Sequence, residues 1–254
     1  MKMLEINNLS KNFGGLSAVL GVDINLNEGD LVGLIGPNGA GKTTIFNLLT
    51  GVYPISEGKI SFRENSLVNK KTHVIANKGI TRTFQNIRLF KNLSVLDNVK
   101  IGMHKKCNYG LLTSFFRLPK FYKQEEQVRE LSLQLLEEVG LADKFETIAE
   151  NLSYGQQRRL EIARALATQP QLLLLDEPAA GMNPQESQEL IELIKNIKKK
   201  YNLTVLLIEH DMSVVMNVCE RIYVLDYGSI IAEGRPEEIK TNKRVIEAYL
   251  GGDI

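Results

Sequence analysis

Residues 36–43 have the types and spacing that a phosphate-binding loop needs. The segment reads Gly36-Pro37-Asn38-Gly39-Ala40-Gly41-Lys42-Thr43. Glycines let a backbone curl its N–H groups around phosphate oxygens, and side chains at these positions would obstruct that approach. A lysine ammonium supplies a compact positive charge for the β- and γ-phosphates, and a threonine hydroxyl is placed to ligate magnesium. The sequence therefore predicts a phosphate cradle here.

Two further segments place polar side chains directly after apolar runs. Four consecutive leucines lead into Asp176 and Glu177. The apolar segment 204–208 leads into Glu209 and His210 in the same manner. Such runs indicate buried parallel strands whose carboxyl ends open on a ligand crevice. Asp176 is expected in the outer coordination sphere of magnesium, Glu177 is a candidate general base for an attacking water, and His210 is expected to reach the terminal phosphate.

The elements that must position these residues follow from hydrophobic patterning. An apolar strand at 31–35 precedes the glycine loop, and a helix at 44–50 follows it and is closed by Gly51. Strand, glycine loop and helix form the setting that a phosphate cradle requires. Combined with the two later strands, these elements predict an α/β fold with a parallel sheet.

Two accessory parts are predicted outside the parallel sheet. Residues 3–9 and 22–26 alternate apolar and polar side chains, which favours an antiparallel sheet that caps the nucleotide side. Residues 127–139 place apolar side chains on one helical face and end at Gly140. This pattern indicates a helical subdomain.

Composition excludes several classes of protein. The chain has 254 residues, of which 43% are hydrophobic, and a formal net charge of +1. A near-neutral balance argues against a dedicated nucleic-acid binder, whose affinity depends on neutralising phosphates. Apolar runs are only a few residues long, so the chain is not expected to cross a membrane. The two cysteines have neither metal-ligand nor disulfide-framework spacing, which fits a reducing cytosol.

A thirteen-residue segment carries a resemblance to a known family. Residues 152–164 begin Leu152-Ser153-Tyr154-Gly155-Gln156. They resemble the signature segment of ATP-binding cassette (ABC) ATPases, and the resemblance covers the whole chain. It implies one ABC ATP-binding domain spanning residues 1–254. Within it, the P-loop NTPase core would carry an N-terminal antiparallel β-subdomain and an inserted helical subdomain at about 86–165.

The resemblance also implies that the chain binds ATP and Mg²⁺ and hydrolyses ATP. Phe13 matches the aromatic residue that stacks on adenine, and Gln85 matches the glutamine that senses magnesium and contacts the membrane partner. The implied catalytic residues are Lys42, Glu177 and His210. The implied magnesium ligands are Thr43, Gln85 and Asp176. The implied nucleotide-binding residues are Phe13, Gly36, Pro37, Asn38, Gly39, Ala40, Gly41, Lys42, Thr43, Thr44 and Gln85.

The signature is expected to be a second anion site, used in trans. Ser153 is a good N-cap, and the helix that follows offers its N-terminus to a γ-phosphate. In the family, the phosphate loop and signature of one subunit lie far apart, so a head-to-tail dimer with two sandwiched nucleotides is implied. The residues that would act in trans are Ser153, Tyr154, Gly155 and Gln156.

Two residues depart from the family pattern. Tyr154 stands where the family usually has glycine, and its side chain disfavours a positive φ although its N–H can still donate to phosphate. Asn183 stands where the family often has aspartate. Its role as a helix cap, with Pro184 next and Glu186 three residues on, and a role in the dimer interface remain equally open. Neither departure removes the lysine or the candidate base.

The segment 98–124 combines basic and aromatic residues. It holds six Lys and Arg residues and no acid, a formal charge of +6, together with five of the 17 aromatic residues. Such a mixture occurs where RNA, an anionic membrane surface or a protein groove is bound, and equally where aromatics pack a subdomain with a solvated basic face. Composition does not choose among these.

One subfamily is resembled most closely. Residues 152–159, residues 177–184, the insert after Gln85 and the ending Ala248-Tyr249-Leu250-Gly251 are similar to those of the ATP-binding subunit of branched-chain amino acid importers. This resemblance implies a homodimer or heterodimer with a related ATPase, two transmembrane permeases, a solute-binding protein, and no nucleic acid. The location implied is the cytoplasmic face of the inner membrane.

Three alternatives stay open. The first is an ABC ATPase for urea or another small solute, or for lipopolysaccharide export, because nothing in the chain touches the solute. The second is a soluble ABC ATPase acting on DNA or ribosomes, although the chain has one phosphate loop and no sustained heptads. The third is a nucleotide-gated switch without turnover, against which Glu177 argues.

Overall fold

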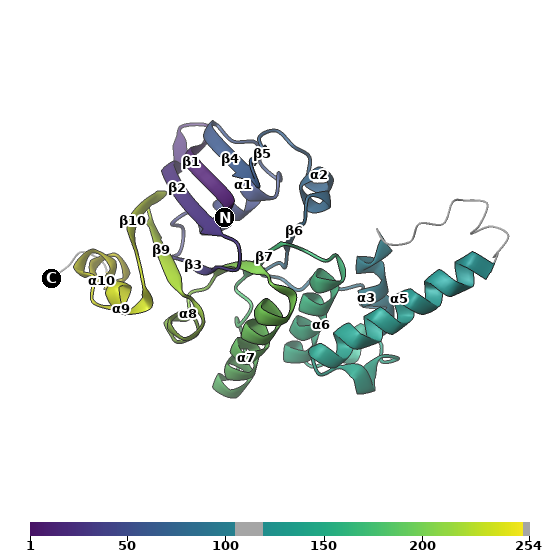
Figure 1. The fold of residues 1–254 in the computed structure, drawn as a ribbon. Coiled ribbons are helices and arrows are strands. Elements are labelled where there is room, and N and C mark those ends of the chain that lie inside the picture. Colours follow the sequence, from purple (N-terminus) through teal and green to yellow (C-terminus); the bar gives the residue numbers. More distant parts are fainter. Residues whose placement is uncertain (105–118, 251–254) are drawn as a thin grey trace. The chain divides into compact units, whose positions relative to one another are not determined.

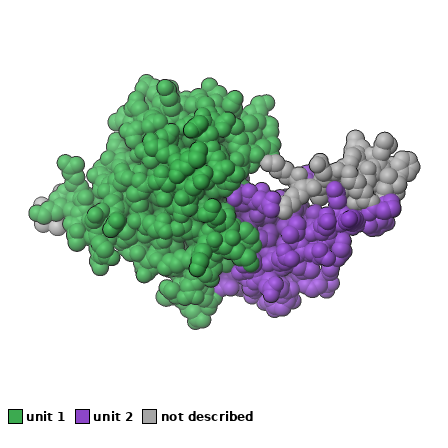
Figure 2. Space-filling model, viewed as in Figure 1, with its two compact units in different colours: residues 1–82, 171–254 green, residues 83–170 purple. Residues whose placement is uncertain are grey.

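The structure is a computed structural model that describes residues 1–104 and 119–250. It divides into two compact units, which are coloured separately in Figure 2. The first unit contains residues 1–82 and 171–254, and the second contains residues 83–170. The second unit is therefore one continuous segment inserted between the two parts of the first.

The N-terminal sheet of the first unit is antiparallel, as the alternating pattern predicts. Its strands are β1 (Lys2–Phe13), β2 (Leu16–Asn27), β4 (Glu57–Phe62) and β5 (Asn65–Ser66). They lie in the order β2-β1-β4-β5 (Figure 1). Both long strands exceed the predicted segments 3–9 and 22–26, because their pairing continues past several register shifts up to the turn at Gly14.

The second sheet contains the strands on which the site is built. Its strands are β3 (Leu31–Ile35), β6 (Ile80–Arg82), β7 (Leu172–Asp176), β8 (Thr204–Ile208), β9 (Arg221–Asp226) and β10 (Ser229–Gly234). Their order is β10-β9-β3-β8-β7-β6, with every pair parallel except β9 and β10. All residues of β3, β7 and β8 are buried, which explains why these strands are apolar without alternation. The predicted parallel sheet is confirmed.

The first unit also contains helices, the last two of which follow the final strand. They are α1 (Lys42–Leu49), α2 (Thr72–Asn77), α7 (Pro184–Tyr201), α8 (Met212–Val218), α9 (Pro236–Lys240) and α10 (Lys243–Leu250). The helix predicted at 44–50 begins two residues earlier, because Gly41 takes a left-handed N-cap conformation that lets Lys42 join the first turn. Asn183 caps α7 in a capping box with Glu186, which confirms its predicted role as a cap.

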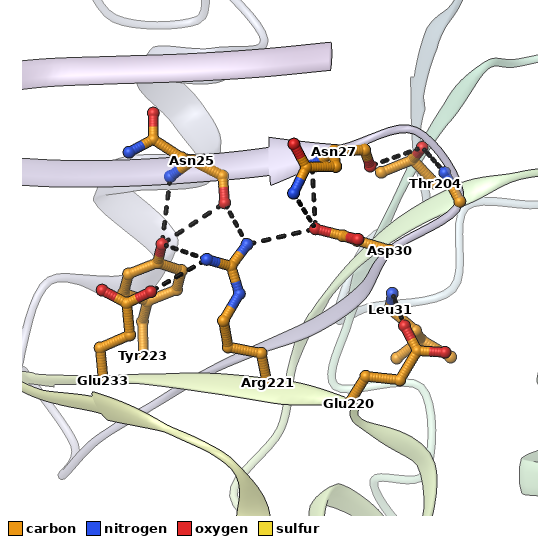
Figure 3. A network of polar contacts seen from close by, with 10 residues as sticks. Asn25, Asn27, Asp30, Leu31, Thr204, Glu220, Arg221, Tyr223 and Glu233 are labelled. Carbon is orange, nitrogen blue, oxygen red and sulfur yellow. Dashed lines mark hydrogen bonds and ion pairs between the residues drawn. The ribbon is translucent and has the colours of Figure 1, made fainter. Parts of the chain in front are cut away.

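A polar network fastens the two sheets of the first unit together (Figure 3). Arg221 donates to the backbone oxygen of Asn25 in β2 and, at 3.2 Å, to Asp30 Oδ2. The same guanidinium donates to Glu233 Oε1 in β10 at 2.9 Å. The Tyr223 hydroxyl accepts the Asn25 N–H at 3.2 Å. The planar guanidinium, with several donors in fixed directions, therefore adds oriented contacts to the apolar packing between these sheets.

The second unit is helical. Its helices are α3 (Val95–Gly102), α5 (Pro119–Glu138) and α6 (Tyr154–Ala167), with 3₁₀ turns at Ala142–Lys144 and Ala149–Asn151. The predicted helix at 127–139 is the C-terminal part of α5, whose first turns lack the apolar periodicity that marks the rest. Helix α3 packs against both α5 and α6. Of the basic and aromatic segment 98–124, residues 105–118 lie outside the described part of the chain.

Across residues 1–104 and 119–250, no helix combines the length and the apolar character that crossing a membrane requires.

Candidate nucleotide site

Three neighbouring strands of the first unit carry candidate catalytic residues at their carboxyl ends. Strands β3, β8 and β7 are adjacent and parallel, so these ends share one edge of the sheet. The glycine loop follows β3, Asp176 ends β7 and precedes Glu177, and His210 lies two residues beyond β8. The topology thus brings Lys42, Asp176, Glu177 and His210 to one edge.

The three glycines of the loop are required for different reasons. Gly36, Gly39 and Gly41 have φ angles of 150°, 82° and 106°. A Cβ atom at Gly36 would lie 1.9 Å from the backbone oxygen of Leu225, and one at Gly41 would lie 2.5 Å from that of Ala18. A Cβ atom at Gly39 would meet no atom within 4 Å. Gly36 and Gly41 are therefore needed because another part of the backbone passes close to each of them. Of the three glycines, Gly39 alone faces open space that a ligand could occupy.

Lys42 is folded over its own loop. Lys42 is 7% exposed, and its Nζ donates to the backbone oxygens of Gly36 at 2.7 Å and Pro37 at 2.8 Å. Burial lowers the pKa of Lys42, while the negative charges of Glu177 and Asp176 act in the opposite direction. The ammonium group is therefore within electrostatic reach of both carboxylates.

The oxygen donors of this edge fit a magnesium ion. Thr43 lies in the first turn of α1 and is exposed, whereas Asp176 is 2% exposed. Asp176 Oδ2 accepts a hydrogen bond from Arg82 Nη2 at 2.6 Å, and Arg82 also donates to Asn47 Oδ1 at 2.7 Å. Hydroxyl and carboxylate oxygens are ligands that Mg²⁺ prefers. The described residues contain no cluster of three or more His, Cys, Asp or Glu side chains that could hold a metal.

Glu177 and His210 face one another. Glu177 has a left-handed φ of 46°, and its N–H donates to the backbone oxygen of Ile208 at 2.8 Å. Its carboxylate Oε2 lies 3.5 Å from His210 Nδ1, and the two side chains are 16% and 55% exposed. A partly shielded carboxylate next to an imidazole is an arrangement suited to receiving and passing a proton.

The exposed aromatic Phe13 lies at the end of β1. Its residue is 42% exposed, and the Tyr53 ring meets it edge-on with the ring centroids 5.2 Å apart. Lys11 Nζ lies 4.9 Å from the centroid of the Phe13 ring. A partly exposed aromatic ring at this position is suited to stacking on a base.

Sequence reasoning missed four residues of the first unit. Arg82, which binds Asp176, ends a three-residue strand too short for its pattern to stand out. Tyr53 has no local pattern at all. Tyr249 lies in α10; burial raises its pKa, and a hydrogen bond with the backbone of Gly36 acts in the opposite direction. Glu209 was noted only as an acid after a strand, yet it is fully buried.

The signature residues lie in the second unit. Ser153 caps α6 in a capping box with Gln156, as its predicted role as an N-cap requires. Tyr154 is the first residue of α6, so its helical backbone needs no positive φ. Gly155 follows in the same turn. The N–H groups of this first turn point beyond the helix N-terminus, where an anion is favoured.

Gln85 also lies in the second unit, where α6 holds its backbone. The fully buried Arg158 donates to the backbone oxygens of Phe84 at 2.7 Å and Gln85 at 2.8 Å. Arg158 also pairs with Glu161 at 2.8 Å, and Glu161 accepts the Arg88 N–H at 3.2 Å. The segment that contains Gln85 is therefore tied to the helix that begins at the signature.

Comparison with known proteins shows which family the chain resembles over nearly its whole length. The family model described as "ABC transporter" matches residues 19–180, and the one described as "Branched-chain amino acid ATP-binding cassette transporter" matches residues 229–254. The high-affinity branched-chain amino acid transport ATP-binding protein LivG of Salmonella typhimurium is 47% identical over 249 residues, which cover 98% of each chain.

Two solved structures extend this likeness to three dimensions. The ADP conformation of MJ1267, an ATP-binding cassette of an ABC transporter, has a TM-score of 0.86 and 36% identity over 99% of each chain. A dimeric post-hydrolysis state of the ATP-binding cassette MJ0796, bound to ADP and Pi, has a TM-score of 0.78 and 26% identity over 92% of this chain and 99% of that one. With these matches and the geometry of the glycine loop, the chain belongs to the ABC transporter family, as one of its ATP-binding cassettes.

Proposed function

We propose that this protein is the ATP-hydrolysing, energy-coupling subunit of an ABC importer for branched-chain amino acids. The observation that carries the proposal is the meeting of the glycine loop, Lys42, Asp176, Glu177 and His210 at one edge of a parallel sheet. The importer class and its solute are supported by the whole-length likeness to LivG and by the match of residues 229–254.

The glycine loop and Lys42 bind and orient the phosphates in this scheme. Backbone N–H groups beside Gly39 and at the N-terminus of α1 point at phosphate oxygens, and the Lys42 ammonium supplies positive charge. Thr43 and Asp176 are the residues of this edge of the first unit that would hold Mg²⁺. An Mg²⁺ ion held there would supply positive charge against the charge that develops on the γ-phosphoryl group.

Glu177 is the general base and His210 its partner. The Glu177 carboxylate accepts a proton from the attacking water, so that oxygen gains charge as it approaches the γ-phosphate. His210 Nδ1 lies 3.5 Å from the Glu177 carboxylate, and the imidazole would donate to an oxygen of the γ-phosphate. Phe13 stacks on the adenine, which positions the phosphates without acting on them.

A head-to-tail dimer completes each site. Ser153 and the first turn of α6 from one subunit bind the γ-phosphate held by the glycine loop of the other. The dimeric, nucleotide-bound structure of MJ0796 supports an assembly of this kind. Binding thus favours the closed dimer, and hydrolysis removes the phosphate that bridges its halves, which releases it.

The partners are two permeases, a related second ATPase subunit and a solute-binding protein, with the chain on the cytoplasmic face of the membrane. Purification of the native membrane complex, followed by identification of the co-purifying permeases, tests this assignment. ATP-dependent uptake of labelled leucine, isoleucine or valine by the reconstituted complex is the expected result. Uptake of urea alone, or co-purification with lipopolysaccharide-export components, would overturn the solute assignment while leaving the ATPase intact.

A further inference from the structure

The Glu209 carboxylate joins the two segments that carry the base and the histidine. Oε1 accepts the N–H of Ala179, two residues after Glu177, at 2.8 Å. Oε2 accepts the N–H groups of His210 at 3.0 Å and Asp211 at 3.3 Å. One side chain therefore binds both the loop after β7 and the loop after β8.

This carboxylate is placed where its charge is unfavourable. Glu209 is 0% exposed, and burial raises its pKa, while hydrogen bonds from Ala179, Asp211 and His210 act in the opposite direction. A strand buried along its whole length could end in an apolar side chain without this desolvation cost. What the carboxylate adds is acceptors for three N–H groups on two separate loops.

The backbone of Glu177 needs such support. Its φ of 46° is uncommon for a non-glycine residue, and a strained backbone of this kind persists only where its surroundings fix it. The Glu177 N–H donates to Ile208 on one side, and Ala179 is bound by Glu209 on the other. His210 Nδ1 also lies 3.8 Å from Glu209 Oε2, close to the 3.5 Å that separates it from Glu177 Oε2.

We infer that Glu209 is a positioning residue for ATP hydrolysis, whose buried carboxylate holds the loop after Glu177 and the backbone of His210 at a fixed separation. The inference rests on the proposed function, because it assigns Glu209 to the reaction that Glu177 and His210 carry out. Glu209 does not touch the reacting atoms. It sets the distance at which the base and its histidine partner face each other.

The test is the Glu209→Gln variant of the full chain. Glutamine keeps the shape, but its amide nitrogen cannot accept an N–H, so one loop loses its anchor. The expected result is a kcat lowered about 10- to 100-fold with an unchanged KM for ATP, because small misplacements of catalytic groups cost this much. Turnover is expressed per nucleotide-binding site, counted by ADP titration, so that partial unfolding does not imitate the effect. Glu209→Asp, with the carboxylate withdrawn by one methylene, gives a smaller loss and serves if the glutamine variant does not fold.

Glu220→Gln is the matched control. Glu220 also binds a backbone N–H, that of Leu31 at 3.1 Å, but at the opposite end of β3 from the glycine loop. The kcat of the Glu220→Gln variant is expected to equal that of the unmodified chain. In a His210→Ala background, Glu209→Gln is expected to lower kcat by a smaller factor than in the unmodified chain, because part of its effect acts through His210.

The inference would be overturned if Glu209→Gln had the wild-type kcat. It would also be overturned if Glu209→Gln lowered kcat by the same factor in the His210→Ala background as in the unmodified chain. The proposed function fails differently. It is wrong if the unmodified chain does not hydrolyse ATP or if Glu177→Gln hydrolyses it at the wild-type rate. If Glu177→Gln is inactive while Glu209→Gln is fully active, only the role of Glu209 is refuted.

Discussion

At the scale of single residues, Glu177 gives the most direct test of the chemistry. Glu177→Gln keeps the size of the side chain but cannot accept a proton from water, so turnover should fall on the order of 10²- to 10⁴-fold. ATP affinity should not change, because the proposed phosphate ligands are the glycine loop and Lys42, which the substitution leaves intact. The measurements are phosphate release and nucleotide titration on the same preparation. Unchanged turnover would remove Glu177 from the mechanism.

Substitutions at two glycines of the loop should affect different properties, stability at Gly36 and ATP binding at Gly39. Gly36→Ala places a methyl group 1.9 Å from the backbone oxygen of Leu225, so the loop must shift and the protein should lose several kcal/mol of stability, about 3 or more. Gly39→Ala meets no atom of the chain and costs only the strain of its φ of 82°, on the order of 1–2 kcal/mol, yet its methyl group enters the ligand's space.

Urea unfolding and nucleotide titration of both variants check this contrast. Gly39→Ala should remain folded and bind ATP more weakly than the unmodified chain. If Gly36→Ala were as stable as Gly39→Ala, the close approach of Leu225 would not be the reason for glycine at position 36.

Residue types and spacing predicted the glycine loop because its chemistry demands adjacent residues. The same holds for Asp176 and Glu177, which directly follow a strand. Arg82 and Glu209 could not be found in this way. Arg82 binds Asp176 on β7, and Glu209 binds Ala179 in the loop after β7. Only the sheet order, with β6 beside β7 and β7 beside β8, brings these partners into contact.

At the scale of elements, the buried pair on α6 should dominate the stability of the second unit. Arg158→Met leaves Glu161 as an unpaired carboxylate in a site where it is 1% exposed, which should cost about 3–5 kcal/mol. Arg158→Met combined with Glu161→Leu removes both charges and should recover part of that loss. Urea unfolding measures both variants. A larger loss in the double variant than in the single one would contradict the buried-charge explanation.

The sequence predicts an element's bounds best where all of its residues are buried. Strands β3 and β8 match the predicted segments in both bounds, because every residue of both strands is buried and nearly all of them are apolar. Helix α5 begins eight residues before the predicted helix at 127–139, because its early turns carry mainly polar and charged residues without an apolar face. Strands β1 and β2 run past the predicted bounds because β-bulges shift their alternation, which periodicity alone does not follow.

At the scale of the whole molecule, the trans role of the signature predicts a dimer defect without a folding defect. Ser153→Arg puts a bulky cation where a γ-phosphate of the partner's nucleotide should lie, so ATP should no longer close the dimer. Ser153→Ala is the control, because it removes only the cap of α6 at a cost of about 1 kcal/mol. Sedimentation velocity with ATP, in a Glu177→Gln background that preserves the nucleotide, measures both. Normal dimerisation of Ser153→Arg would count against a shared pocket.

The Arg221 network fixes the separation between the two sheets of the first unit. Phe13 belongs to the sheet that contains Asn25, and Lys42 follows a strand of the sheet that contains Arg221, so ring and ammonium keep a set distance. In the proposed mode of binding, a nucleoside would contact only Phe13, and inorganic triphosphate would contact only the glycine loop and Lys42. A nucleoside triphosphate would contact both, so each single subunit would select its ligand by length.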